Sequence, residues 1–233
     1  MSGGAQTVDL ASASLRDLNA ALHALPHDTN MTRWHVRNPD GRHAIAAGLT
    51  APVRVEIDGH AGYYCAGMNM AATVIVRGNA GTGVAENMMS GRVHVLGDAS
   101  QSAGASAHGG LLLIEGNAAA RCGISLKGAD IVVKGSVGHM SAFMAQSGTL
   151  AVFGDAGEGF GDSIYEAHLY VRGRVASLGA DCIEKPMRDH HRAELLALLS
   201  EAGAAGAVDV GAFRRYGSAR TLYTFHVDNA AAY

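Results

Sequence analysis

Seven glycines recur in the middle of this chain at a constant spacing of nineteen residues, with no insertion or deletion between them. They are Gly59, Gly78, Gly97, Gly116, Gly135, Gly154 and Gly173. An unbroken period of this length indicates one short structural unit stacked on itself many times. This register limits the possible folds more than any other feature of the sequence.

Other positions of the repeat also keep their character. The residues two and four before each glycine are aliphatic, the residue two after it is Ala or Val, and the residue seven after it is Ala or Gly. Aliphatic residues at alternate positions predict a five-residue strand with one buried face, which ends at the glycine. We expect a positive φ at that glycine. Asn79, Asp98, Asn117 and Asp155 follow directly and are typical turn residues.

Nineteen residues are too few for a strand–helix–strand unit of ~30 residues, and the apolar pattern has no helical period. One coil of a parallel β-helix fits this length. The sequence therefore predicts an all-β core: a single-stranded parallel β-helix of about seven coils, taken as right-handed, with short helical flanks. At ~4.8 Å per coil the rod would be roughly 34 Å long.

Composition supports this fold class and excludes several functions. The chain has 31 glycines but only 4 prolines, and no sustained Gly-X-Y triplet, which excludes collagen. An apolar share of 48% with a net charge of −3 argues against disorder and gives no basic footprint for nucleic acid. No apolar run approaches the ~18 residues of a membrane span. The first residues, MSGGAQTVDL, do not resemble a signal peptide, so we expect a cytoplasmic protein.

The outward positions of the predicted strands carry two kinds of side chain. Just before the glycine, Asp58 lies one coil from Arg77, and Glu115 one coil from Lys134, which predicts ion pairs between neighbouring coils. Other outward positions are apolar: Ile75, Leu96, Leu111, Leu113, Val132, Ala151 and Phe153. Either the terminal segments of the chain cover these residues, or they form an interface with a partner. Both alternatives stay open at this point.

The flanking segments differ from the repeat and divide the chain into 1–52, 53–185 and 186–233. Leucines at helical spacing predict a helix over 14–25, with Ser14 as its cap, and an irregular connection follows over 26–52. A second amphipathic helix is predicted over 187–202, with Met187, His191, Leu195, Leu198 and Ala202 on one stripe. The stretch 211–233 is basic in its middle and ends in aromatic residues. We expect helical caps at both ends of the β-helix.

No catalytic, cofactor-binding or metal-binding residue is predicted in this chain. His60, His94, His108, His139 and His168 fall in different columns of the repeat, so they would fan out around the rod. Cys65 and Cys122 share a column but lie three coils apart, and small buried packing is their expected role. Glu86, Glu158 and Glu166 have no evident catalytic partner. The methionines Met68, Met70, Met88, Met89, Met140 and Met144 are interpreted as gap-filling core residues.

The coils GHAGYYCAGMN (59–69), GNAGTGVAENMMSG (78–91), GDASQSAGASAHGG (97–110) and GHMSAFMAQSG (138–148) carry a family resemblance. Residues 45–185 resemble the G-x-G-x-G β-helix domain of the large subunit of glutamate synthase, which is shared by a subunit of formylmethanofuran dehydrogenase. The whole chain is most similar to the free-standing glutamate-synthase-like subunit of N-methylglutamate synthase. The sequence departs from a strict G-x-x-G pattern at Ser100, Ala119 and Ala176.

This resemblance implies a non-catalytic subunit of a divided enzyme. Its partners would be a glutamine-amidotransferase-like subunit and a synthase subunit that holds FMN and a 3Fe–4S cluster. The implied reaction converts glutamate and methylamine to N-methylglutamate and ammonia. The alternatives are the same scaffold in another complex, of the glutamate synthase or formylmethanofuran dehydrogenase type, and an autonomous β-helix enzyme acting on acyl or sugar substrates. No family catalytic residue falls on a position of the β-helix.

Overall fold

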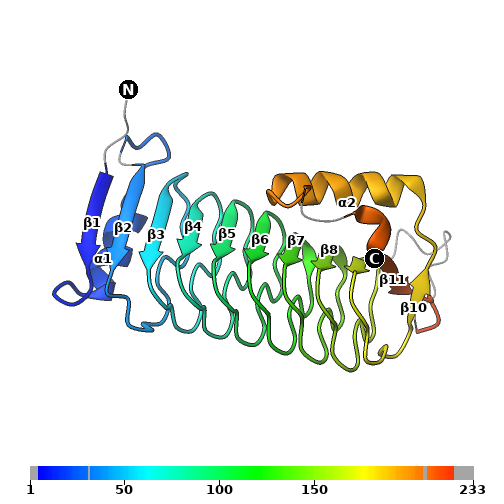
Figure 1. The fold of residues 1–233 in the computed structure, drawn as a ribbon. Coiled ribbons are helices and arrows are strands. Elements are labelled where there is room, and N and C mark those ends of the chain that lie inside the picture. The colour runs from blue at the N-terminus through cyan, green and yellow to red at the C-terminus, as the bar shows by residue number, and fades with distance from the viewer. Residues whose placement is uncertain (1–4, 31, 207–208, 223–233) are drawn as a thin grey trace.

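The computed structural model describes residues 5–30, 32–206 and 209–222, and these form a rod built on one long sheet (Figure 1). Eleven strands lie in the order β1-β2-β3-β4-β5-β6-β7-β8-β9-β11-β10. Their bounds are β1 Ala5–Asp9, β2 Arg33–Arg37, β3 Arg54–Asp58, β4 Thr73–Val76, β5 Arg92–Val95, β6 Leu111–Ile114, β7 Lys127–Val133, β8 Ser147–Val152, β9 His168–Val171, β10 Cys182–Lys185 and β11 Arg214–Ser218. Two α-helices occur in the described part of the chain, α1 (Leu15–His23) and α2 (Asp189–Glu201).

The predicted β-helix is confirmed. From β3 to β9 each strand pairs in parallel with the strand one repeat later, so that Val55 lies opposite Val74 and Leu150 opposite Leu169. A second ladder of single bridges runs from Ala61 and Ala80 to Ala156 and Val175, the column two residues after the repeat glycine. Because all these coils have the same length, equivalent residues of successive coils lie above one another. Each aliphatic column therefore forms a continuous buried stripe.

The solenoid begins before the regular repeat does. Strand β2 pairs in parallel with β3, with Arg33 opposite Arg54, so the paired residues are further apart in the chain than in the regular repeat. Strand β1 pairs in parallel with β2, with Ala5 opposite Arg33, and this separation is longer still. This first interval contains α1, whose buried Leu18 and Leu22 face the core. An irregular connection was predicted over 26–52, and this prediction is wrong for Arg33–Arg37. These residues form β2, which belongs to an additional coil of the solenoid before the regular repeat.

Glycine is required at the repeat positions for a different reason from the predicted positive φ. Only Gly59 among the seven has a positive φ, of 141°. At the others the backbone of the preceding coil is too close for a side chain: a Cβ on Gly116 would lie 2.9 Å from the carbonyl oxygen of Gly97 and nearer still to Oδ1 of Asp98. That approach is needed because the Gly116 N–H donates to the same Gly97 carbonyl at 3.1 Å.

A ladder of polar side chains follows the glycine column. The Asp98 N–H donates to Oδ1 of Asn79 at 3.0 Å, the Asn117 N–H to Asp98 Oδ1 at 2.7 Å, and the Ser136 N–H to Asn117 Oδ1 at 2.9 Å. Each acceptor occupies the space beside the next glycine, where a Cβ would otherwise stand. The turn residues seen in the sequence thus accept hydrogen bonds from the backbone of the next coil, and each of them requires a glycine in that next coil.

Positive φ angles occur instead in the turns that close each coil. Tyr64, Ala66 and Met68 have φ values of 60°, 53° and 54°, and the equivalent positions of the next five coils repeat this pattern. The middle position is the small column seven residues after the glycine, where Ala66, Ala85 and Ala142 are fully buried. A small residue is favoured there because the left-handed conformation crowds Cβ while the interior leaves little room.

The interior is filled by aliphatic side chains and cysteines, as predicted, but not by most of the methionines. Met88 is fully buried, whereas Met68, Met70, Met89 and Met144 are between 37% and 50% exposed. Gap filling is therefore the wrong interpretation for these four. Two of them, Met68 and Met144, occupy left-handed turn positions, so their side chains point away from the core.

The C-terminal end is closed by two antiparallel pairs. Strand β11 lies between β9 and β10, with Arg215 opposite Tyr170 on one side and Lys185 on the other. The prediction of a helical cap is wrong at this end, because α2 runs along the side of the rod, over the later strands (Figure 1). The predicted aromatic tail, 223–233, lies outside the described residues.

Candidate functional site: the outer face of the sheet

Helix α2 and the segment after it cover much of the candidate interface. Leu111, Leu113, Val132 and Phe153 are 0–5% exposed, and they form a cluster with residues from the C-terminal segment. The covering residues are Leu195, Leu198, Leu199, Ala202, Ala204 and Phe213. At these four positions the first alternative is therefore correct: the C-terminal segment of the chain covers them. They do not form a free interface for a partner. The apolar stripe predicted for 187–202 is the surface that meets them.

The remaining candidate residues lie where α2 does not reach. Leu96 follows β5 and is 40% exposed, while Ile75 on β4 is 8% exposed. In the strand register Ile75 lies between Glu56 and His94, and these two residues flank it on the outer face. Ala151 is also buried, so Leu96 remains the one exposed residue among the seven outward apolar positions.

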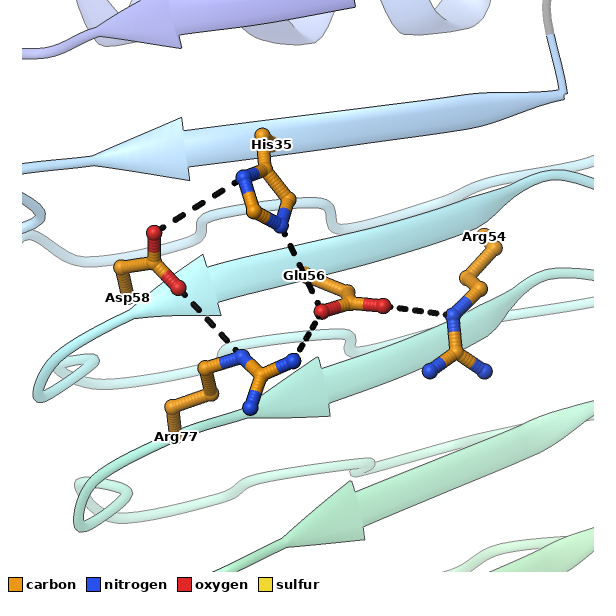
Figure 2. A network of polar contacts seen from close by, with 5 residues as sticks. All are labelled: His35, Arg54, Glu56, Asp58 and Arg77. Carbon is orange, nitrogen blue, oxygen red and sulfur yellow. Dashed lines mark hydrogen bonds and ion pairs between the residues drawn. The ribbon is translucent and has the colours of Figure 1, made fainter. Parts of the chain in front are cut away.

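The uncovered half of the face carries an ion-pair network centred on Glu56 (Figure 2). Glu56, in the middle of β3, accepts hydrogen bonds from Arg54 Nε at 2.7 Å and from a terminal nitrogen of Arg77. Its carboxylate also lies 3.4 Å from His35 Nε2. Asp58 lies 3.4 Å from Arg77 Nε, as the sequence predicted, and 3.8 Å from His35 Nδ1. Strand alternation places these side chains outward, because 54, 56 and 58 share one face of β3.

The electrostatics of this network favour a structural role. The guanidinium of Arg77 and then that of Arg54 lower the pKa of Glu56 to about 2. A carboxylate that is held ionised by two guanidiniums is a poor proton acceptor at neutral pH. An open groove of about 250 Å³ adjoins it, lined by Trp34, His35, Arg54, Glu56 and residues of β1. The network thus stabilises three neighbouring coils beside a shallow groove.

A second predicted ion pair is present three coils further along. Lys134 Nζ lies 2.7 Å from Glu115, and His94 Nε2 lies 2.8 Å from the other carboxylate oxygen. Burial alone would raise the pKa of Glu115, but the bonds from Lys134 and His94 outweigh it, so the pKa is lowered. Pairing between neighbouring coils therefore works as predicted, with His94 as an additional partner that the sequence reasoning missed.

A polar cluster under the start of α2 was not predicted. Glu194 accepts from His168 Nδ1 at 2.8 Å and from the Tyr170 hydroxyl at 3.1 Å, and the His191 ring lies 5.6 Å from that of His168. Burial, and then the charges of Arg215 and neighbouring histidines, lower the pKa of His191 to about 4. The available signal was the pair of outward polar side chains on β9, opposite the polar first turn of the helix.

The other residues considered for chemistry lie apart. Glu166 pairs with Arg220 at 2.9 Å. Burial raises the pKa of the Cys65 and Cys122 thiols to about 12, so both are protonated and packed in the core. Within the described ranges, no three His, Cys, Asp or Glu side chains gather as metal ligands. Neither described helix is long and apolar enough to cross a bilayer.

The fold and this face define a parallel β-solenoid with one covered and one uncovered outer half. No family model matches the chain. The chain is 59% identical over 226 residues to protein GlxC of Rhizobium meliloti (strain 1021), and the match covers 97% of this chain and 99% of that protein. The two sequences therefore align almost from end to end, and this chain belongs to the GlxC family.

Proposed function

We propose that this chain is a non-catalytic assembly subunit of an FMN-dependent complex of the glutamate synthase type. The observation that carries the proposal is the solenoid itself: coils of nineteen residues, with the glycine column and small column found in the resembling G-x-G-x-G domains. A stack of identical coils gives a stiff rod, which suits a part that holds two larger subunits in a fixed relation.

The proposed complex is N-methylglutamate synthase, in which glutamate and methylamine yield N-methylglutamate and ammonia. In this proposal the amidotransferase-like partner and the synthase partner, which carries FMN and the 3Fe–4S cluster, supply all catalytic groups. The family relation to GlxC rests on an alignment that covers 99% of that relative, so the comparison extends over the whole solenoid.

Two other assignments make different predictions. A glutamate synthase or formylmethanofuran dehydrogenase type of complex would use the same scaffold with other partners. An autonomous acyl or sugar enzyme would turn over substrate without partners. The ionised Glu56, held by two arginines, favours the scaffold over this last alternative.

Co-expression with the genes that neighbour its own tests the proposal. We expect the tagged chain to purify with two larger chains, and the complex to show a flavin spectrum and form N-methylglutamate from glutamate and methylamine. The isolated chain should be colourless. A colourless complex, or an isolated chain that binds flavin, would contradict the assignment. A complex that carries flavin but ignores methylamine would leave the scaffold role standing and exclude this substrate.

A further inference from the structure

A small polar pocket lies on the outer face at the C-terminal end of the rod. Its volume is about 60 Å³, and its walls include Lys185, Arg215 and Arg220, with Glu166 as the acidic member. Glu166 already pairs with Arg220 at 2.9 Å. At neutral pH three positive charges and one negative charge leave the pocket with an excess of two positive charges.

The fold itself brings these cations together. Because β11 is inserted antiparallel between β9 and β10, Lys185 lies directly opposite Arg215. Gly217, two residues further on β11, also lines the pocket. A Cβ at Gly217 would meet only the Lys185 stem, at 3.8 Å, so the glycine leaves open space beside the two cations.

The hydrogen bonding of Arg215 indicates a missing acceptor. Its Nε is buried and has no hydrogen-bond partner. Among the described residues, no carboxylate lies within ion-pair distance of Lys185 or Arg215, whereas Arg214 and Arg220 each have one. The charges of Lys185 and Arg215 are therefore uncompensated at the pocket wall, and an oxyanion is the strongest acceptor for such cationic donors.

We propose that this pocket binds one phosphate group as the dianion, either inorganic phosphate or the terminal phosphate of a small metabolite. The excess of two positive charges matches a dianion, and the volume suits one such group, with the rest of a metabolite outside. Burial and then the positive charge of Arg215 lower the pKa of His191, so the charge of Arg215 also acts on the neighbouring ring.

Titration of the full chain with inorganic phosphate, followed by ³¹P line broadening and calorimetry, tests this site. We expect saturable binding that Arg215→Gln weakens at least tenfold and Arg215→Lys weakens less. Arg174→Gln is the matched control because it removes the same charge at a site outside the pocket. The side chain of Arg174 is 91% exposed. Lys185→Met gives an independent test should Arg215→Gln fail to fold, as judged by circular dichroism.

Two further arms separate the sources and the chemistry. Glycerol phosphate that binds at least as tightly as inorganic phosphate would identify a phosphorylated metabolite, whereas much weaker binding would identify the free anion. Acetate at equal ionic strength should not compete. Phosphate binding that is not saturable, that survives both pocket variants, or that acetate displaces equally well would overturn the proposal.

Discussion

The two halves of the outer face of the sheet differ sharply although the core beneath them is the same. Over β2 to β5 the outward positions carry charged and polar side chains such as His35, Glu56 and His94, and they remain open to solvent in part. Over β6 to β9 the equivalent positions carry Leu113, Val132 and Tyr170, and α2 buries them. The inward columns therefore decide the fold, whereas the outward columns decide what lies against it.

This contrast separates two kinds of apolar surface. A run of outward aliphatic residues in the later coils marks intramolecular packing, because the same chain supplies a helix with a matching stripe. In the earlier coils the end of α2 contacts Arg92 on β5, but Leu96 stays 40% exposed. An exposed apolar residue such as Leu96 is therefore a better sign of contact with another protein.

A buried charge in the covered half should have the largest effect. Val132→Asp would place a carboxylate between β7 and α2 at a site with 0% exposure, and we expect a loss of more than about 3 kcal/mol in unfolding free energy. Leu96→Asp, in the open half, should change it by less than about 0.5 kcal/mol. Urea unfolding measures both. Equal losses would show that the two halves are packed alike.

The glycine column is common to both halves and should be sensitive everywhere. Gly116→Val would press a side chain against the Gly97 carbonyl and the Asp98 carboxylate, and we expect a loss of about 2 kcal/mol. Gly206→Val is the control, since a Cβ there would meet nothing within 4 Å. If both variants unfold at the same denaturant concentration, close stacking of the coils is not the reason for these glycines.

The covered half should also lose stability first on acidification. His191 has its pKa lowered to about 4, so between pH 6.5 and 4 the unfolded chain binds a proton that the folded chain does not. Stability should fall by about 1–2 kcal/mol as the pH drops through this window. His191→Gln keeps an acceptor for the Arg188 N–H, a bond of 3.2 Å in the native chain, and should abolish this slope. Melting curves that keep the slope in the variant would exclude His191 as its source.

The open half should respond at lower pH and more weakly. The pKa of Glu56 is lowered to about 2, so its contribution is complete above pH 4.5 and is lost as the pH falls from 4.5 to 2. Because its arginine partners are nearly half exposed, we expect Glu56→Gln to cost only about 1 kcal/mol at pH 7. Glu158→Gln, an exposed carboxylate outside the network, serves as the control in the same denaturant titration. A loss of equal size in the control would mean that net charge, not the network, is responsible.

The stacking and strand register of the regular repeat could be predicted from the sequence because every coil has the same length. The aliphatic columns, the ion pairs of Asp58 and Glu115, and both helices follow from alternation and spacing alone. The first coils were not predicted because the longer spacings from β1 to β2 and from β2 to β3 break the period. The glycine φ angles were predicted wrongly, since a glycine required for a close approach and one required for a positive φ look identical in a sequence.

The position of α2 and the cluster around Glu194 depend on tertiary packing. An amphipathic stripe indicates that a helix covers something, but not whether it covers the end of a rod or its side. His168 and Tyr170 become partners of Glu194 only once the helix lies along the rod, because they are 26 and 24 residues away from it in the chain. Local spacing carries no information about such a contact.

Native mass spectrometry of the tagged chain, purified from its own cells under mild conditions, is the sharpest test of the scaffold role. We expect one assembly that contains this chain and two larger subunits, with FMN that stays with the largest partner when the assembly is dissociated. A chain that is recovered alone, or that itself retains the flavin, would show that it is not the scaffold of such a complex.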